Sequence, residues 1–558
     1  METTSTFKED FLKIPHLPTI CLLIGYLFYW VELYFLNNRT GRTTPLAFLL
    51  FLAILIISLI KQRRSIHALT DNFRKTWNRQ DRPVKNFVVI NGIAVSAIII
   101  IVLYASLLPP HLIQEFDALN YHLTIPRQHL ISGSFQHLTW SSADLFPLPI
   151  DFALAPYWFA TELPNKIPQF IFLIGLVLVS INLVKRFSSA NFASIWLTIF
   201  AIISLHCLAI QMGTAMLDIV ICYLFIAGLD SFLEGNIFIA AVEFTFFLWA
   251  KSFMPLQVLF IITAIWLIWL ISKYFGFKDT KLGFGEVIDL QDRQQYGRNF
   301  KKLLVSVIAL SILVGGPFLI KSTYYSGTPL FPFAPGLINT NNIDKNSTGW
   351  NSMLASSKTH LNVKDKYGYP RTLPDFVQSL WLIAVPEKGV NNRFDYPAGL
   401  TYLLFLGPFI YMLFCSLRKK QFPILPLIVV IFGLSWWAGS QQTRFLYIPI
   451  ILMIIAVASE VKSLSVVFMA AISISMALTG ISLFRAHRSD FGKSRLEVLR
   501  LKDKELIKAN ESYFAERKPD SVSLGYFDAA YARFPVFVTK PDSFWVLNPG
   551  NQGRQSQK

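Results

Sequence analysis

The chain has little of what a disulfide-bonded, zinc-binding or nucleic-acid-binding protein contains. Only 4 of its 558 residues are cysteines, and all four lie in apolar stretches, without the spacings of disulfide frameworks or zinc sites. The net charge is +17, but the basic residues cluster between apolar runs and form no basic stripe on a polar domain, so nucleic acid is not an expected partner. A cleavable signal peptide is not expected either, because the charges before the first apolar run are mixed and no small-residue cleavage site follows.

Long uncharged runs are what the chain does contain. Hydrophobic residues make up 53% of it, its mean hydropathy is +0.46, and the run from Phe87 to Leu108 would span about 33 Å as a helix. We therefore predict an α-helical, polytopic membrane protein with about thirteen transmembrane helices. They are expected near 19–36, 45–61, 87–108, 165–184, 190–208, 213–231, 236–252, 254–273, 303–320, 399–416, 422–438, 445–459 and 463–484.

Basic loops predict how the chain is oriented in the membrane. The 61–85 loop carries eight Lys or Arg residues against two Asp, and such loops are retained in the cytoplasm. Lys185 with Arg186, the 273–302 loop and the basic triplet 418–420 fall on the same side if every predicted helix spans. Residues 109–164 and 321–398, and the tail from about 485, are then expected to be extracytoplasmic.

The pattern divides the chain into three parts. Residues 1–86 are predicted to form a two-helix membrane extension with the basic cytoplasmic loop, and residues 87–484 the main membrane domain. Residues 485–558 are more polar, with an amphipathic helical pattern followed by the strand-like runs "SVSLGYF" (521–527) and "PVFVTK" (535–540). They are predicted to form a small extracytoplasmic α/β cap.

The stretch "EFDALNYHLTIPRQHL" (115–130) places acids, histidines and an arginine directly after a membrane run. It is too polar to span, so an amphipathic helix over 117–131 is expected along the membrane surface. Asp117 would then lie at the helix N-terminus, where the helix dipole favours the ionised carboxylate that a general base requires. The alternative is an interfacial acid that is simply solvated. Four histidines fall within 27 residues, but their spacings of 11, 7 and 8 do not suit metal ligands on a helix.

Several stretches in order resemble the GT-C superfamily of membrane glycosyltransferases, in the bacterial branch related to dolichyl-phosphate-mannose protein mannosyltransferases. "EFDALNYHLTIPRQHLISG" (115–133) looks like the first extracytoplasmic loop of that superfamily. "YYSGTPLFPF" (324–333), "FDYPAGLTYLLFLGP" (394–408) and "WWAGSQQTRFLYIPI" (436–450) resemble later motifs of the branch, and "AMLDIVICYL" (215–224) fits a helix with an acid at its outer end. The resemblance covers residues 87 to about 460.

The resemblance implies an inverting glycosyltransferase that moves a sugar from a polyprenyl-phosphate donor to an acceptor. Asp117 is then the expected general base, with Glu115 in reserve. The leaving phosphate needs positive charge more than a proton, and one base suffices for a single displacement. The acceptor class stays open among glycolipid, polysaccharide and protein. No cofactor is assigned, and dependence on a divalent metal is left open.

Further candidates would bind the substrate. An acid inside an apolar run, such as Asp218, is costly and therefore a functional candidate, although a helix-packing hydrogen bond is equally compatible. Arg127 and Arg444 are phosphate candidates, and Lys251 interrupts an uncharged stretch where it meets an anion or extends to the membrane surface. Weaker candidates for contact with the sugar or phosphate are His122, Tyr325 and Gln441.

A lipid or polysaccharide transporter, or flippase, is the alternative function. Transporters commonly contain inverted repeats and broken helices in mid-membrane, and the sequence contains no internal repeat. Its charged residues are also expected to gather at one membrane face. We therefore expect an integral protein of a bacterial cytoplasmic (inner) membrane, in contact with membrane lipids, with an extracytoplasmic active site.

Overall fold

The computed structural model describes most of the chain, and everything below concerns those residues. They are 14–36, 41–62, 74–110, 115, 117–138, 141–161, 163–187, 192–277, 279–281, 283–284, 290–338, 348–362, 367–385, 394–461, 463–495, 497–498, 522–523 and 546–547.

The protein is an α-helical membrane protein. Six of its helices are long and apolar enough to cross a membrane: α2 (Leu17–Tyr34), α5 (Arg82–Leu107), α8 (Ile167–Phe187), α13 (Met254–Tyr274), α18 (Leu400–Arg418) and α21 (Val466–His487). A seventh span is possible if α14 (Leu290–Val314) and α15 (Gly316–Ser326), which meet at 57°, cross as one bent unit.

Every one of the thirteen predicted ranges contains a helix, but several of these helices are shorter than a bilayer requires. The shorter ones include α3 (Leu46–Lys61), α9 (Phe192–Ile203), α11 (Asp218–Glu234), α12 (Ile237–Leu248), α19 (Ile424–Ala438) and α20 (Tyr447–Ala458). About 20 residues are needed for a straight crossing. The presence of helices is thus confirmed, while their number as membrane spans stays a prediction.

Smaller elements connect these helices. The helical ones are η1 (Ile14–His16), η3 (Ala118–His122), α6 (Thr124–Ser132), η4 (Ser142–Leu145), α7 (Pro149–Trp158), α10 (His206–Gln211), α16 (Thr348–Asn362), α17 (Leu373–Leu382) and η6 (Thr443–Leu446). The strand β1 (Asp279–Lys281) pairs in parallel with β2 (Gln421–Pro423), and β3 (Val522–Ser523) pairs antiparallel with β4 (Val546–Leu547). β3 lies within the predicted run 521–527, whereas the run 535–540 and most of the predicted cap lie outside the described residues.

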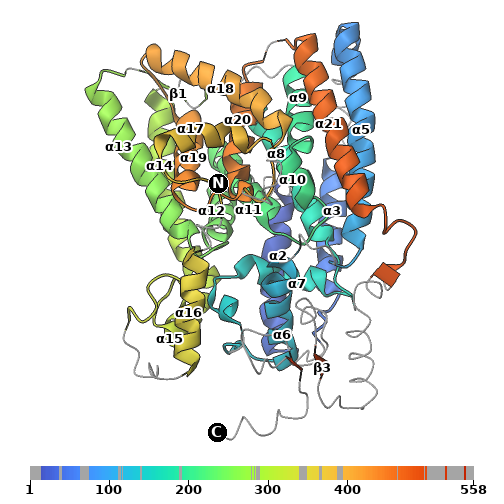
Figure 1. The fold of residues 1–558 in the computed structure, drawn as a ribbon, viewed down its shortest axis with the longest axis vertical. Helices are drawn as coiled ribbons and strands as arrows, with labels where there is room; N and C mark the ends of the chain where they lie inside the picture. Colours follow the sequence, from blue (N-terminus) through green and yellow to red (C-terminus); the bar gives the residue numbers. More distant parts are fainter. Residues whose placement is uncertain are drawn as a thin grey trace, which may run out of the picture.

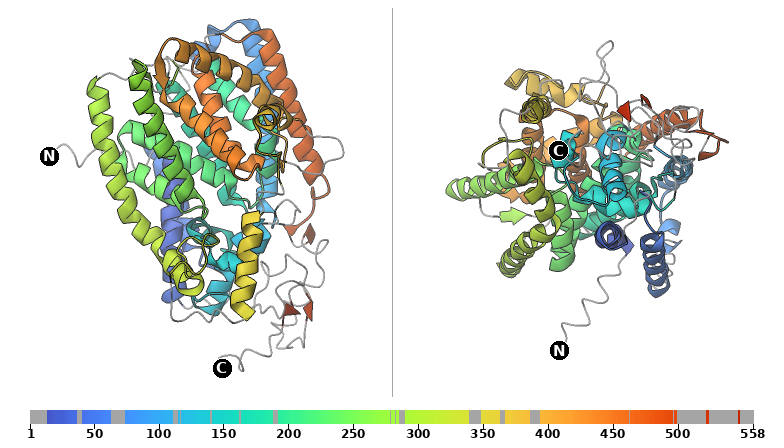
Figure 2. Two further views of the ribbon diagram at one scale, coloured as in Figure 1. Left: turned by 60° about the vertical axis from the view of Figure 1, so that its left-hand side comes forward. Right: turned by 90° about the horizontal axis from the view of Figure 1, so that it is seen from below.

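The helices form a bundle with distinct edges and a buried centre. α13 and α14 lie along one edge, and α21 packs along α5 at the opposite edge (Figures 1 and 2). α6, α7, α15 and α16 gather towards one end of the bundle (Figure 1). Every residue of α20 is buried, whereas α13 exposes most of its apolar side chains, as a lipid-facing helix does.

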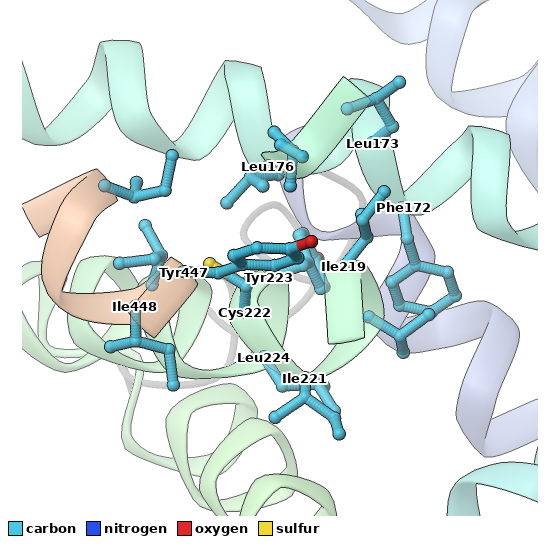
Figure 3. Close-up of a cluster of buried hydrophobic side chains, with 14 of the residues drawn as sticks. Phe172, Leu173, Leu176, Ile219, Ile221, Cys222, Tyr223, Leu224, Tyr447 and Ile448 are labelled. Carbon is cyan, nitrogen blue, oxygen red and sulfur yellow. The ribbon is translucent and has the colours of Figure 1, made fainter. Parts of the chain in front are cut away.

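The centre of the bundle is an apolar layer between α8, α11 and α20. The Tyr223 ring of α11 lies between Phe172 and Leu176 of α8 and Tyr447 of α20 (Figure 3). Tyr223 is fully buried, and its ring packs edge-on against that of Phe172 with centroids 5.1 Å apart. Burial of each such side chain contributes about 1.5–3 kcal/mol.

A helix break near Ser204 positions the short helix α10. The Ser204 carbonyl, freed where α9 ends, accepts hydrogen bonds from the hydroxyls of Ser475 and Thr479, each at 3.1 Å, and from Thr401 at 3.4 Å. Broken helices are tolerated inside membrane proteins when side chains satisfy the freed backbone groups in this way. These contacts from α18 and α21 hold α10, which leads to Gln211 and the start of α11.

The 117–131 segment differs from its prediction. It is a π-helix, η3, followed by α6, and every residue of α6 from Thr124 to Ile131 is buried. An amphipathic helix along the membrane surface is therefore wrong here. The segment is covered by α2 and α7 and bonded internally: the Thr124 hydroxyl donates to the Leu119 carbonyl at 2.6 Å, and the Tyr29 hydroxyl donates to the Pro126 carbonyl at 2.8 Å.

Candidate functional site

A polar cavity of about 190 Å³ lies where the loops before η3, α11, α17, α18 and α20 meet. We call it the Arg444 cavity, and its described lining consists of Asp117, Met216, Tyr367, Asp395, Tyr396, Gln442 and Arg444. It thus brings together the two residues that the sequence predicts as base and phosphate ligand, Asp117 and Arg444.

Arg444 is the centre of the cavity's charge arrangement. Its Nη1 donates to Oδ2 of Asp117 at 2.7 Å, and its Nε lies 3.3 Å from Oδ2 of Asp395. The three side chains are 14%, 22% and 16% exposed, so each is reachable from the cavity and largely shielded from bulk solvent. A charge-assisted contact in such surroundings is stronger than the same contact on the surface.

A second ion pair lies beside the first. Lys251, in the turn between α12 and α13, donates to Oδ1 of Asp218 at 2.7 Å, and Gln211 donates to the other carboxylate oxygen at 3.0 Å. Lys251 Nζ lies 4.5 Å from the centre of the Phe445 ring, and the Arg444 guanidinium carbon lies 5.3 Å from the same centre. The two cations therefore share one aromatic ring, an arrangement that favours positive charge.

The segment that carries Arg444 is held by its neighbours. The indole N–H of Trp436 donates to the Gln442 carbonyl at 2.8 Å, and both the backbone N–H and the hydroxyl of Thr443 donate to the Phe394 carbonyl, each at 2.8 Å. These bonds tie the start of α20 to the loop that carries Asp395. Two segments about 50 residues apart thus present their side chains to one cavity.

The two cavity acids have opposite pKa directions. Burial disfavours the charged form of Asp117, but Arg444 and His122 more than offset it, and the pKa of Asp117 is lowered. Burial also dominates at Asp395, where Arg444 compensates less and the negative charges of Asp218 and Asp117 add to the effect. The pKa of Asp395 is raised to about 6. Asp117 is therefore ionised at neutral pH, while Asp395 titrates close to it.

His122 lies next to the cavity without being among its described lining residues. Its Nδ1 is hydrogen-bonded to Oδ1 of the buried Asp151 of α7. A carboxylate on one ring nitrogen fixes the tautomer and the orientation of an imidazole. Within the described part of the chain, Nε2 of His122 has no partner.

Glu115 has structural partners. Its Oε1 accepts from the backbone N–H of Ala215 at 2.9 Å and lies 3.3 Å from Nζ of Lys166, and both charged side chains are fully buried. A paired acid without exposure is unsuited to taking a proton from a substrate. Glu115 instead ties the chain before η3 to the loop before α11, on the two sides of the Arg444 cavity.

Three other candidates lie outside the described cavity lining. Gln441 accepts from the Tyr369 N–H at 2.7 Å and donates to the carbonyls of Tyr369 and Trp437, so its amide fixes the segment before α17. The adjacent Gln442 lines the cavity instead. Arg127 is buried with its guanidinium 5.2 Å from the Phe159 ring centre, and Tyr325 packs on the ring of His137.

Tyr325 borders a separate buried cluster around Asp144. Lys321 donates to Oδ1 of Asp144 at 2.7 Å, His129 Nε2 lies 2.7 Å from the same oxygen, and His137 Nδ1 lies 3.0 Å from Oδ2. The cluster joins α6, η4 and α15. It explains His129 and His137, two of the four closely spaced histidines of the sequence, as partners of a buried acid. Across the described residues, no group of three or more His, Cys, Asp or Glu side chains is arranged to hold a metal ion.

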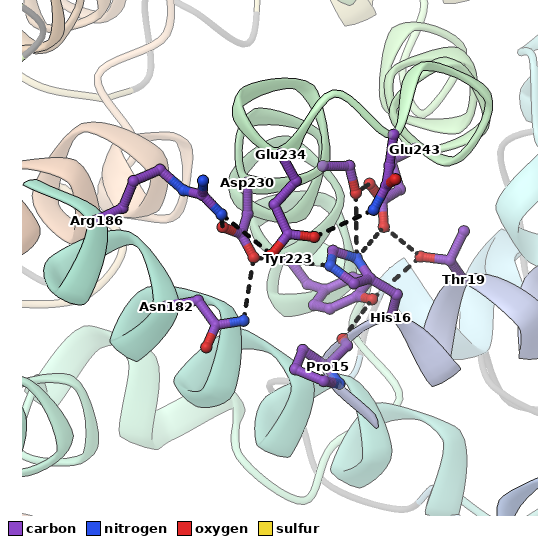
Figure 4. A network of polar contacts seen from close by, with 11 residues as sticks. Pro15, His16, Thr19, Asn182, Arg186, Tyr223, Asp230, Glu234 and Glu243 are labelled. Carbon is purple, nitrogen blue, oxygen red and sulfur yellow. Dashed lines mark hydrogen bonds and ion pairs between the residues drawn. The ribbon is translucent and has the colours of Figure 1, made fainter. Parts of the chain in front are cut away.

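A third ionic network lies at the other end of α11 (Figure 4). His16 Nδ1 lies 2.9 Å from Glu243 and Nε2 lies 3.6 Å from Asp230, while Arg186 contacts Asp230 at 3.4 Å. The expectation that charged residues gather at one membrane face is therefore wrong. α11 carries an acid near each end, Asp218 and Asp230, with the apolar layer of Figure 3 between them.

Sequence reasoning missed several cavity residues, above all Asp395. It lies in the quoted motif "FDYPAGLTYLLFLGP", where an acid in a polar loop gives no signal of its own. Tyr367, Tyr396 and Met216 were also missed. Asp151 had a detectable signal, since it is an acid within the otherwise uncharged run from Phe146 to Phe159.

Comparisons with known proteins do not identify the chain. No protein-family model matches the sequence, and no curated protein is significantly similar to it. The function of the Arg444 cavity must therefore be argued from its own geometry and chemistry.

Proposed function

We propose that the protein is an inverting glycosyltransferase that moves a sugar from a polyprenyl-phosphate donor to an acceptor hydroxyl or amine. The observation that carries the proposal is the contact between Asp117 and Arg444 in one polar cavity of a membrane protein. An ionised acid and a guanidinium side by side supply the two groups that the reaction needs, a base for the acceptor and a cation for the leaving phosphate.

Arg444 binds the donor phosphate in this proposal, with Lys251 as the second cation. As the glycosidic bond breaks, negative charge grows on the phosphate oxygen that leaves, and a fixed guanidinium stabilises that charge more than it stabilises the bound donor. Lys251 contacts the same Phe445 ring as Arg444 and adds to the positive potential. Asp218 and Gln211 orient the Lys251 ammonium by direct hydrogen bonds.

Asp117 takes the acceptor's proton in this proposal. Its contact with Arg444 contributes to a lowered pKa, which keeps Asp117 ionised and makes it a weak base. A phosphate that shares the Arg444 charge reduces this effect, so Asp117 becomes a stronger base once the donor is bound. The arrangement therefore favours proton removal after donor binding. One base is sufficient because a single displacement inverts the anomeric carbon.

A lipid-linked donor suits the protein's surroundings. The sugar and phosphate would occupy the polar cavity while the prenyl chain remains between helices or in the bilayer. We propose a bacterial cytoplasmic membrane, with the Arg444 cavity on the extracytoplasmic side, and an acceptor that is a glycolipid, a polysaccharide or a protein. The resemblance of residues 87 to about 460 to GT-C enzymes points to the same reaction.

The test is sugar release without a membrane. Purified protein in detergent is incubated with a panel of polyprenyl-phosphate sugars, and free polyprenyl phosphate is measured. The expected result is release with at least one donor, lowered by a factor of at least about 10² in Asp117→Asn, the scale expected for loss of a general base. Asp81→Asn is the matched control, because Asp81 is exposed at the start of α5.

The outcome separates the transferase from a lipid transporter or flippase. In detergent there is no second leaflet, so a transporter releases no sugar from its phosphate whichever donor is supplied. Absence of release with every donor would favour the transporter. Release that is unchanged in Asp117→Asn would keep the transferase and remove Asp117 from the role of base.

A further inference from the structure

The two edges of the Arg444 guanidinium are occupied unequally. The Nη1 donor makes a short bond to Asp117 at 2.7 Å. On the other edge, Nη2 is 3.4 Å from Oε1 of Gln442, and Nε is buried without a hydrogen bond in the described structure although Asp395 lies 3.3 Å away. A buried donor without a bond is costly. The Nε–Nη2 edge is therefore the edge that a bidentate oxyanion would complete.

Asp395 is held on that edge by its backbone. The preceding carbonyl, of Phe394, accepts both Thr443 bonds at 2.8 Å, and the N–H of Ala398 donates to the Ile383 carbonyl at 2.7 Å. Asp395 itself has a φ of 77°, in the left-handed region that only a small share of non-glycine residues adopt. The loop is thus fixed from both sides, with the Asp395 carboxylate facing Arg444.

The charges around Asp395 do not balance when all groups are ionised. The groups that face it are Arg444 from η6, Asp117 before η3, Asp218 from α11, Lys251 after α12 and the phenols of Tyr367 and Tyr396. Three carboxylates against two cations leave one excess negative charge before any phosphate enters. A phosphodiester adds another, and like charges at this distance cannot all persist in a partly buried site.

We propose that Asp395 is an internal competitor for the donor phosphate, and that a phosphate oxygen takes the Nε–Nη2 edge of Arg444 while Asp395 takes up one proton from solvent. The proposal rests on the proposed function and adds a proton-linked step to donor binding. Protonation removes one negative charge without movement of the fixed loop. The neutral carboxyl can then donate a hydrogen bond to the phosphate.

The size of the effect follows from the fraction of Asp395 that is already protonated. With its pKa raised to about 6, about one tenth of Asp395 is protonated at pH 7, and the donor affinity is lowered to about one tenth of its value for fully protonated Asp395. Asp395→Asn is permanently neutral and is expected to bind a phosphodiester about tenfold more tightly than the wild type at pH 7. The two proteins should bind nearly equally at pH 5.

The experiment is isothermal titration calorimetry of the full chain in detergent with farnesyl methyl phosphate. This phosphodiester keeps a single negative charge between pH 5 and 8, so its own ionisation does not contribute. Titrations at pH 7 in two buffers with different ionisation enthalpies give the number of protons taken up. The wild type should take up about 0.9 proton per phosphodiester through Asp395. Asp395→Asn should take up about 0.9 proton fewer than the wild type.

Two further variants separate this proposal from the proposed function. Asp81→Asn should behave as the wild type, and Arg444→Gln should lose binding at every pH. Equal proton uptake in the wild type and Asp395→Asn, or weaker binding by Asp395→Asn, would overturn the role of Asp395 and leave the donor site intact. Normal binding by Arg444→Gln would instead remove the donor site itself.

Discussion

Asp395→Asn should stabilise the protein, and more at high pH than at low pH. In the folded protein, burial raises the pKa of Asp395 from its ordinary value of 3.8 to about 6. Because each pH unit of difference corresponds to about 1.4 kcal/mol, ionised Asp395 destabilises the folded state by about 3 kcal/mol. The folded state binds this proton more tightly than the unfolded chain does. Its penalty is therefore absent below about pH 4, grows between pH 4 and 6, and is complete above pH 6.

The assay is thermal unfolding in detergent at several pH values. At about 2.1 cal/mol/K per residue, 558 residues give an unfolding entropy of about 1.2 kcal/mol/K, so about 3 kcal/mol corresponds to a Tm increase of about 2–3 °C at pH 8. Helices that persist in detergent lower this entropy and enlarge the shift. At pH 5 the difference between variant and wild type should fall to about half.

The Tm of the variant is compared with that of the wild type at the same pH, so the contributions of other titrating groups to stability cancel. Asp81→Asn controls for the loss of any carboxylate, because Asp81 is exposed. A Tm difference between Asp395→Asn and the wild type that stays constant from pH 8 to pH 5 would refute the raised pKa. A lower Tm in Asp395→Asn would mean that its ion pair with Arg444 outweighs burial.

Three further outcomes are expected. Glu115→Gln should lower thermal stability, because it leaves the buried Lys166 charge without its acid, with a cost of about 3–5 kcal/mol; turnover per folded molecule should stay near that of the wild type. Arg444→Lys should lose about tenfold in turnover, since lysine keeps the charge but not the two-pronged geometry, and Arg444→Gln should lose more. In a cysteine-free background, cysteine at Leu373 should be labelled from outside intact cells and cysteine at Asn78 should not; the reverse would invert the proposed orientation.

The positions of the helices could be predicted because they depend on local composition. A run such as 87–108 must satisfy its backbone internally wherever it lies in a membrane, so its helical state follows from the run alone. The lengths could not be predicted in the same way. The predicted helix 190–208 breaks at Ser204, where hydroxyls of two distant helices donate hydrogen bonds to the freed Ser204 carbonyl. Those hydroxyls lie about 200 or more residues away.

The candidate site could be predicted only in part, for the same reason. Asp117 and Arg444 each had a signal, an acid after a membrane run and a cation at a helix start, but their contact joins residues 327 positions apart. Loop residues follow no helix or strand periodicity, so the direction in which their side chains point could not be predicted. The sequence therefore favoured Gln441 when Gln442 lines the cavity, and it missed Asp395, whose importance comes only from its contact with Arg444.

The apolar layer between the two ends of α11 bears on the choice between transfer and transport. Asp218 and Asp230 are 12 residues apart, or about 18 Å along the helix. Between them, Tyr223 and its neighbours are buried against α8 and α20, and the Tyr223 hydroxyl turns to Thr19 and Pro15 in the network of Figure 4.

A transporter that moved a polar head group along α11 would have to pass this layer, so α8, α11 and α20 would separate and several large side chains would lose their packing. At about 1.5–3 kcal/mol for each buried side chain, opening four or five of them costs on the order of 10 kcal/mol. A transferase needs no such opening, because in the proposed reaction the donor head group stays at the Asp218 end of α11. The packing of Tyr223 thus favours a reaction at one end of α11.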